Sequence, residues 1–248
     1  MKLCVLDNDV LDPALAPTYV GYGAMFVRLL REAGADWSID IFNTVQRQYP
    51  ASFDAYDAVL LTGSRADSFS QDAWVLALRQ HVVQLLHAKK TLVGVCFGHQ
   101  LIALCLGAPV GRAPQGWGTG RMNYQWHAPG LPQAQGRTEF ALLASHQDQV
   151  FELPSGATLL ASSAFCPVAA FAVEQHVLCI QPHPEFVEDY SAYLLNKRRA
   201  QLGEALYRAS HDSLALGHDG QQVARMMVAF VEGHRAGAAL DGPSILPL

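Results

Sequence analysis

The sequence predicts an α/β fold in which a mostly parallel β-sheet is covered by helices on both faces. Two observations in residues 1–106 indicate this class. Short, almost continuously apolar runs, typical of strands buried on both faces, alternate with longer stretches of helical periodicity. Gly63 and Cys96 directly follow two of these runs, so both residues are expected at the carboxyl ends of parallel strands, where active groups gather in such sheets.

The first half of the chain supplies the parallel strands and the helices that connect them. An apolar stripe over residues 22–33 predicts a helix that Gly34 ends. Asp72 is expected to cap a second helix with its stripe over 74–85, and a third helix starts at Cys96. The expected strands are 3–6, 37–42, 58–62 and 91–95.

The pattern changes after Gly107. Residues 111–120, rich in Gly, Pro and Gln, are expected to form a loop, and the short strands that follow predict a small antiparallel element. Helices resume after Phe186 and over 223–231, and residues 237–248 are expected to be a frayed or docked tail. We therefore expect one domain over 1–190 and a C-terminal helical extension over 191–248 packed on it. The expected strands are 121–126, 138–144, 158–163, 168–173 and 177–181.

Composition and charge restrict the class of protein. Half of the 248 residues are hydrophobic, enough for one large core without disulfides or metals. The net charge of −5, the pI near 6.0 and the lack of a basic run argue against nucleic-acid binding. Five scattered cysteines without a Cys-x-x-Cys pair indicate neither a disulfide framework nor a zinc site, which suits a cytoplasmic protein. No stretch resembles a secretory signal or a membrane-spanning helix.

A Gly-x-Cys-x-Gly pattern ends the strand expected at 91–95. Gly94-Val95-Cys96-Phe97-Gly98 is typical of a nucleophile elbow, where a sharp strand-to-helix turn thrusts one side chain out of the sheet between small neighbours. The helix N-terminus that follows favours the thiolate form of the sulfur. The alternative is a buried structural cysteine, but the two glycines favour a nucleophile.

A histidine between two prolines follows the strand expected at 177–181. The prolines stop the strand and fix the direction of His183, and Glu185 can reach one ring nitrogen and set the tautomer. The other ring nitrogen would then face Cys96. A solvated loop histidine is the alternative. Together with the elbow, the pattern predicts a nucleophile, a base and a carboxylate that orients the base.

Residues 94–100 and 183–185, taken together in this order, resemble the class I glutamine amidotransferase superfamily. The resemblance covers roughly residues 1–190 and implies a catalytic domain there with a flavodoxin-like, three-layer α/β fold. It implies a catalytic triad of Cys96, His183 and Glu185, and neither a metal nor another cofactor.

The resemblance also implies roles for residues around the nucleophile. Backbone N–H groups of Gly63 and Phe97 would form an oxyanion hole, which stabilises the charge that develops on the carbonyl oxygen. The side chains of Gln100, Ser145 and His146 would contact the glutamyl part of the substrate.

The implied reaction is cleavage of the γ-glutamyl amide bond of glutamine or a glutamine-like small molecule through a γ-glutamyl thioester, which gives glutamate plus ammonia or an amine. Thr62-Gly63-Ser64-Arg65 replaces the Gly-Gly-Pro of synthase-linked members, so the chain looks closer to a stand-alone branch that includes γ-glutamyl peptide hydrolases.

Three alternatives stay open at this point. The chain has no phosphate-binding Gly-rich loop with lysine, so an amidotransferase would pass ammonia to a separate synthase subunit. Without such a partner, water takes the acyl group and the protein is a γ-glutamyl peptide hydrolase. The third alternative is a non-catalytic regulatory relative that keeps the fold.

Overall fold

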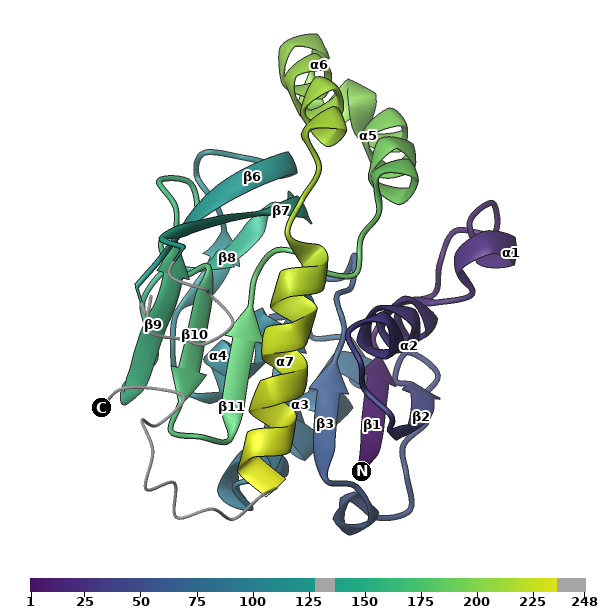
Figure 1. Cartoon of the computed structure of the whole chain (residues 1–248), viewed down its shortest axis with the longest axis vertical. Coiled ribbons are helices and arrows are strands. Elements are labelled where there is room, and N and C mark those ends of the chain that lie inside the picture. The colour runs from purple at the N-terminus through teal and green to yellow at the C-terminus, as the bar shows by residue number, and fades with distance from the viewer. Residues whose placement is uncertain (128–136, 236–248) are drawn as a thin grey trace.

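The computed structural model describes residues 1–127 and 137–235, and in this part of the chain a nine-stranded sheet has the order β2-β1-β3-β4-β11-β10-β9-β6-β7 (Figure 1). The neighbours from β2 to β11 pair in parallel, and those from β11 to β7 pair antiparallel. The expected tail 237–248 lies outside the described residues. The strands are β1 Lys2–Asp7, β2 Ser38–Asn43, β3 Ala58–Leu61, β4 Thr91–Val95, β6 Gly118–Trp126, β7 Glu139–His146, β9 Ala157–Ser162, β10 Ala170–Val173 and β11 Val177–Ile180.

Helices cover both faces of this sheet. In Figure 1, α2 and α7 lie on the near face and α3 and α4 on the far face, while α5 and α6 project beyond the carboxyl ends of the parallel strands. A short antiparallel pair, β5 (Val110–Arg112) with β8 (Asp148–Val150), forms a separate small sheet. The predicted α/β class, with its mostly parallel sheet, antiparallel element and C-terminal helices, is confirmed. The helices are α1 Ala16–Tyr19, α2 Tyr22–Glu32, α3 Ala73–His87, α4 Phe97–Cys105, α5 Glu188–Leu202, α6 Glu204–Ser213 and α7 Gly220–Arg235.

The alternation of side chains along β1 shows how the sheet builds two cores. Leu3 and Val5 pack in a cluster with apolar side chains of α2 and α7. Cys4 and Leu6 point to the opposite face and pack in a cluster with those of α3 and α4. Because successive strand side chains point to opposite faces, a strand covered on both sides must be apolar throughout, which is why the apolar runs predicted the parallel strands.

Two local predictions were wrong. Asp72 precedes α3 but its side chain accepts no capping hydrogen bond. The expected loop 111–120 is shorter, because β5 occupies one end of it and β6 begins at Gly118. The glycines of β6 mark close packing instead of a turn: a Cβ at Gly120 would lie 2.8 Å from Cα of Ser210 on α6.

The turn at Cys96 is sharp and tightly packed. Cys96 has φ 52° and ψ −103°, a strained backbone for a residue with a side chain. A Cβ at Gly94 would lie 2.8 Å from the carbonyl oxygen of Gly98, and a Cβ at Gly98 would lie 2.5 Å from the carbonyl oxygen of Leu61. The two glycines are therefore needed for close approach of β4, β3 and α4 around the turn.

We expect Gly98→Ala to lower the free energy of unfolding by about 2 kcal/mol or more, since the new methyl group meets backbone that cannot move away. Urea denaturation measures this. The matched control is Gly111→Ala, whose methyl group would meet only the ring of Phe151, 3.1 Å away and 40 % exposed, so the ring can shift. Equal loss of stability in the two variants would contradict the packing argument.

Candidate active site

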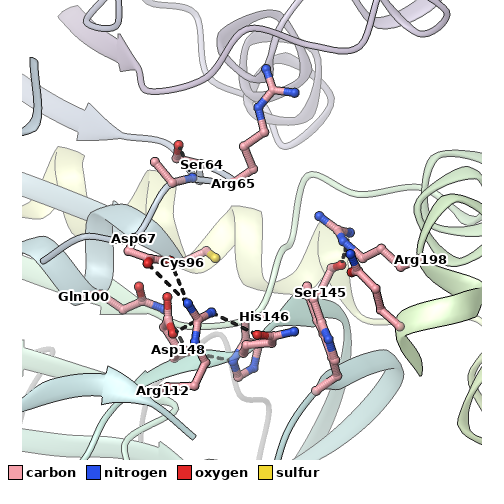
Figure 2. A pocket seen from close by; sticks show the side chains of 14 residues that line it. Ser64, Arg65, Asp67, Cys96, Gln100, Arg112, Ser145, His146, Asp148 and Arg198 are labelled. Atoms are coloured by element: carbon pink, nitrogen blue, oxygen red, sulfur yellow. Dashed lines mark hydrogen bonds and ion pairs between the residues drawn. The ribbon is translucent and has the colours of Figure 1, made fainter. Parts of the chain in front are cut away.

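A cavity of about 410 Å³ opens where β3 and β4 end, with the sulfur of Cys96 pointing into it (Figure 2). Four of the residues that the sequence singled out line this cavity: Cys96, Gln100, Ser145 and His146. They come from the elbow, from α4 and from the end of β7. The fold thus brings together residues that are far apart in the sequence.

His183 lies between the sulfur and a carboxylate. Its Nδ1 is 2.7 Å from Oε1 of Glu185, and Cys96 is its neighbour: a Cβ built on Gly63 would lie 2.8 Å from Cε1 of His183 and 3.6 Å from Cβ of Cys96. Both His183 and Glu185 are buried, at 2 % exposed each. Thiol, imidazole and carboxylate therefore form one chain of contacts.

The charge of His183 follows from these neighbours. Burial by itself would lower the pKa of the imidazole, but the negative charges of Glu185 and Cys96 and the hydrogen bonds to both outweigh it and raise the pKa to about 10. His183 is therefore an imidazolium at neutral pH, a cation that lies beside Cys96.

The ring of His183 is held on several sides. Phe186 stacks on it with ring centroids 3.8 Å apart and planes 11° apart, and Tyr22 lies on Phe186 at 5.9 Å. The backbone N–H of His183 donates to the carbonyl of Leu143 on β7 at 2.9 Å. Gly63 completes the enclosure, because a Cβ there would lie 2.8 Å from Cε1 of His183. Any larger residue at position 63 would displace the imidazole.

The two backbone groups expected to bind an oxyanion are not engaged elsewhere. Within the described residues, neither the N–H of Gly63 nor that of Phe97 donates a hydrogen bond. Gly63 is close to Cys96, since a Cβ built on it would lie 3.6 Å from Cβ of Cys96, and Phe97 is the first residue of α4. The free N–H of Phe97 at the helix N-terminus and that of Gly63 beside Cys96 are suited to bind negative charge.

The side chains expected to contact substrate are fixed by their own hydrogen bonds. The Gln100 amide nitrogen donates to the Asp148 carbonyl at 2.9 Å and to Oε1 of Gln181 at 3.1 Å, which leaves its oxygen for the cavity. Nδ1 of His146 is 2.9 Å from the same Asp148 carbonyl. Burial lowers the pKa of His146 to about 4 even though this carbonyl favours the protonated form, so His146 is neutral.

Two polar groups of the cavity were not predicted from the sequence. Arg198 on α5 donates to Oγ of Ser145 at 2.7 Å, and its guanidinium lies 4.9 Å from the ring centroid of Trp117. Arg112 on β5 pairs with Asp67 at 3.2 Å and with Asp148 at 3.1 Å. In the sequence these arginines look like ordinary surface charges, and no local motif distinguishes them.

His99 has a different environment from the cavity residues. It is fully buried in α4, with its ring 5.1 Å from that of Phe171. Burial lowers its pKa to about 3, so it stays neutral. His99 therefore belongs to the core beneath the elbow, and it does not line the cavity that Cys96 faces.

Two features are absent from residues 1–127 and 137–235. No group of three or more His, Cys, Asp or Glu side chains in this part of the chain could hold a metal ion. No helix in it combines the length and the hydropathy needed to cross a bilayer.

Comparisons with known proteins identify the family of this chain. The family model described as glutamine amidotransferase class-I matches residues 17–197. The chain is 36 % identical over 177 residues to gamma-glutamyl peptidase 3 of Arabidopsis thaliana, covering 68 % of this chain and 70 % of that protein. It is 29 % identical over 171 residues to a glutamine-hydrolyzing GMP synthase of Caldicellulosiruptor saccharolyticus, covering 67 % of this chain and 31 % of the synthase.

The solved structures include a glutamine amidotransferase of Thermotoga maritima that superimposes with a TM-score of 0.74 at 17 % identity, covering 96 % of this chain and 99 % of that one. At this identity the likeness concerns the fold alone. It confirms the predicted flavodoxin-like architecture.

Proposed function

Because the chain belongs to the class-I glutamine amidotransferase family, we propose that it cleaves the γ-glutamyl amide bond of glutamine or of a glutamine-like substrate, with Cys96 as nucleophile, His183 as acid and base, and Glu185 as the group that orients His183. One observation carries the proposal most directly. The Cys96 sulfur faces the cavity from a strained elbow, beside an imidazolium that Glu185 hydrogen-bonds.

In the first half of the reaction the thiolate attacks the γ-carbonyl carbon. The carbonyl oxygen becomes negative and accepts hydrogen bonds from the N–H groups of Gly63 and Phe97, each worth about 3 kcal/mol in the transition state. The C–N bond then breaks, and the departing nitrogen takes the proton of His183. The products of this half are a γ-glutamyl thioester on Cys96 and a free amine, or ammonia.

In the second half a water molecule replaces the amine. His183, now neutral, takes a proton from the water while the oxygen attacks the thioester carbon. Collapse of the second tetrahedral intermediate breaks the C–S bond and releases glutamate. The thiolate and the imidazolium are restored, so the two halves balance as hydrolysis of one amide bond.

Two versions of this activity differ in the fate of the nitrogen released from the amide bond. The resemblance to a protein named gamma-glutamyl peptidase, over two thirds of this chain, favours direct hydrolysis of γ-glutamyl peptides without a synthase. The resemblance to part of a GMP synthase favours the second version, in which ammonia from glutamine passes to a separate synthase subunit. A non-catalytic relative is the third candidate, and the engaged Cys96, His183 and Glu185 count against it.

The test uses the purified chain alone, with Cys96→Ala as the blank. Ammonia released from glutamine is measured beside amine released from γ-glutamyl dipeptides. We expect turnover of the dipeptides, with glutamine slower. If neither substrate is cleaved and iodoacetamide does not label Cys96 at neutral pH, autonomous hydrolysis is wrong and a partner-dependent enzyme is favoured.

A further inference from the structure

A second cavity adjoins the one that Cys96 faces. It has a volume of about 230 Å³ and lies between the segment that follows β1, from Asp9 to Leu15, and helix α5. Arg65, Arg198 and Gln201 line both cavities, so the two are neighbours with a shared wall. A molecule larger than glutamine that reacts at Cys96 could extend from one into the other.

One wall of the second cavity is close to His183. Tyr22 lines it, and the Tyr22 ring stacks toward His183 with centroids 6.4 Å apart. Tyr190 also lines it and donates a hydrogen bond to the hydroxyl of Tyr22 at 2.9 Å. Because His183 gives its proton to the departing nitrogen, the group attached to that nitrogen lies on the His183 side.

The ion pairs of the two cavities leave one cation unpaired. Arg65 pairs with Asp9 at 3.1 Å, Lys197 pairs with Asp12, and Arg112 pairs with two aspartates as described above. Among the described residues, Arg198 makes no ion pair. It hydrogen-bonds the neutral hydroxyl of Ser145, and its charge also acts on the carboxylate of Asp9, which already pairs with Arg65.

The surroundings of Arg198 favour a carboxylate as its missing partner. Stacking on Trp117 and the hydrogen bond to Ser145 fix the plane of the guanidinium, as Figure 2 shows for Ser145 and Arg198. A fixed guanidinium presents a fork of N–H donors that matches the two oxygens of a carboxylate. Part of the second cavity is apolar, lined by Val10, Leu11, Leu15 and Leu194, and the charged residues beside them, Asp9 with Arg65 and Asp12 with Lys197, are already paired.

We propose that the second cavity is the subsite for the leaving amine and that Arg198 binds the carboxylate of that amine. The substrate class is then a γ-glutamyl amino acid or peptide whose released amine carries a free carboxylate and an apolar side chain. This inference rests on the proposed hydrolase function and adds to it a residue that distinguishes such substrates from glutamine.

The experiment compares two substrates that differ only in this carboxylate, γ-glutamyl-leucine and γ-glutamyl-leucinamide, by steady-state kinetics. For Arg198→Gln we expect kcat/KM for γ-glutamyl-leucine to fall roughly 10- to 100-fold, mainly through KM, since a charge-assisted contact is lost. For γ-glutamyl-leucinamide we expect a change of less than about twofold. Arg198→Lys keeps the charge and should recover part of the loss.

Arg199→Gln is the matched control, because Arg199 is the next residue of the same helix, lines neither cavity and pairs with Glu204 instead. It should leave both substrates unchanged. An equal loss on both substrates in Arg198→Gln, or no loss on either, would overturn the subsite while the hydrolase function stands. If the wild-type protein cleaves no γ-glutamyl compound at all, the hydrolase function fails and the subsite fails with it.

Discussion

Replacing Cys96 by alanine is expected to reduce kcat for γ-glutamyl amides by roughly ten-thousand-fold or more, because the proposed thioester can no longer form. The folded structure should persist, since alanine removes only the sulfur and keeps the same strained backbone. The measurements are amine release and the thermal unfolding midpoint. Turnover that survives in the folded variant would falsify the assignment of the nucleophile.

The same variant offers a second readout that does not depend on activity. The negative charge of Cys96 contributes to the raised pKa of His183, so its removal should lower that pKa from about 10. Titration of the His183 ring by NMR measures this shift. A purely structural cysteine would leave the titration of His183 unchanged.

Alkylation of the wild-type protein separates Cys96 from the other cysteines. Burial raises the pKa of Cys4 and Cys166 to about 12 and that of Cys105 to about 11, and it also raises the pKa of Cys179. These four remain thiols at neutral pH and are poor nucleophiles. Iodoacetamide should therefore label Cys96 first, and Cys105→Ser should leave the rate of labelling unchanged.

Glu185→Gln is expected to lower kcat by roughly a hundred- to ten-thousand-fold, because the neutral amide that replaces the carboxylate has no negative charge to stabilise the imidazolium. The pH dependence should change as well. In the wild type His183 keeps its proton until the pH approaches about 10, and loss of the Glu185 charge lowers this pKa. The alkaline limb of kcat/KM therefore moves to lower pH in the variant.

The free energy of unfolding should also depend on the protonation of His183. The folded-state pKa of His183 is above the unfolded value near 6.5, so the charged pair stabilises the fold fully below about pH 6.5, and this contribution disappears as the pH rises through about 10. In Glu185→Gln this loss of stability should occur at lower pH. Glu188→Gln, a half-exposed carboxylate at the start of α5, is the matched control. Identical pH profiles for the wild type and Glu185→Gln would contradict the pairing of His183 with Glu185.

The parallel strands could be predicted because burial on both faces leaves a signal in each strand. The runs expected at 3–6, 58–62 and 91–95 lie within one residue of β1, β3 and β4 at all of their ends. By contrast, β8 is three residues long and contains Asp148 and Gln149, so it has no apolar run to find. Helix α6 was missed for a related reason, since the structure buries only Ser210 in it.

The residues of the candidate site also differ in whether the sequence could predict them. Cys96, Gln100 and His146 belong to short motifs, and all three line one cavity, although their chemical roles stay predictions until the variants are measured. Arg198 has no motif of its own. Arg198 stands out only when the ion pairs of the structure are compared. The other cations of the two cavities each pair with a carboxylate, whereas Arg198 pairs with none among the described residues.

Strand β7 positions two parts of the candidate site, the backbone of His183 and the wall of the cavity at Ser145. Its Leu143 carbonyl anchors the backbone of His183, and two residues further along Ser145 forms a wall of the cavity. A sideways movement of β7 that made room for a bulkier acyl group would also draw the imidazole away from the sulfur. Selectivity can therefore change with less disturbance through α5, where a side chain such as Arg198 can be replaced without moving His183 relative to Cys96.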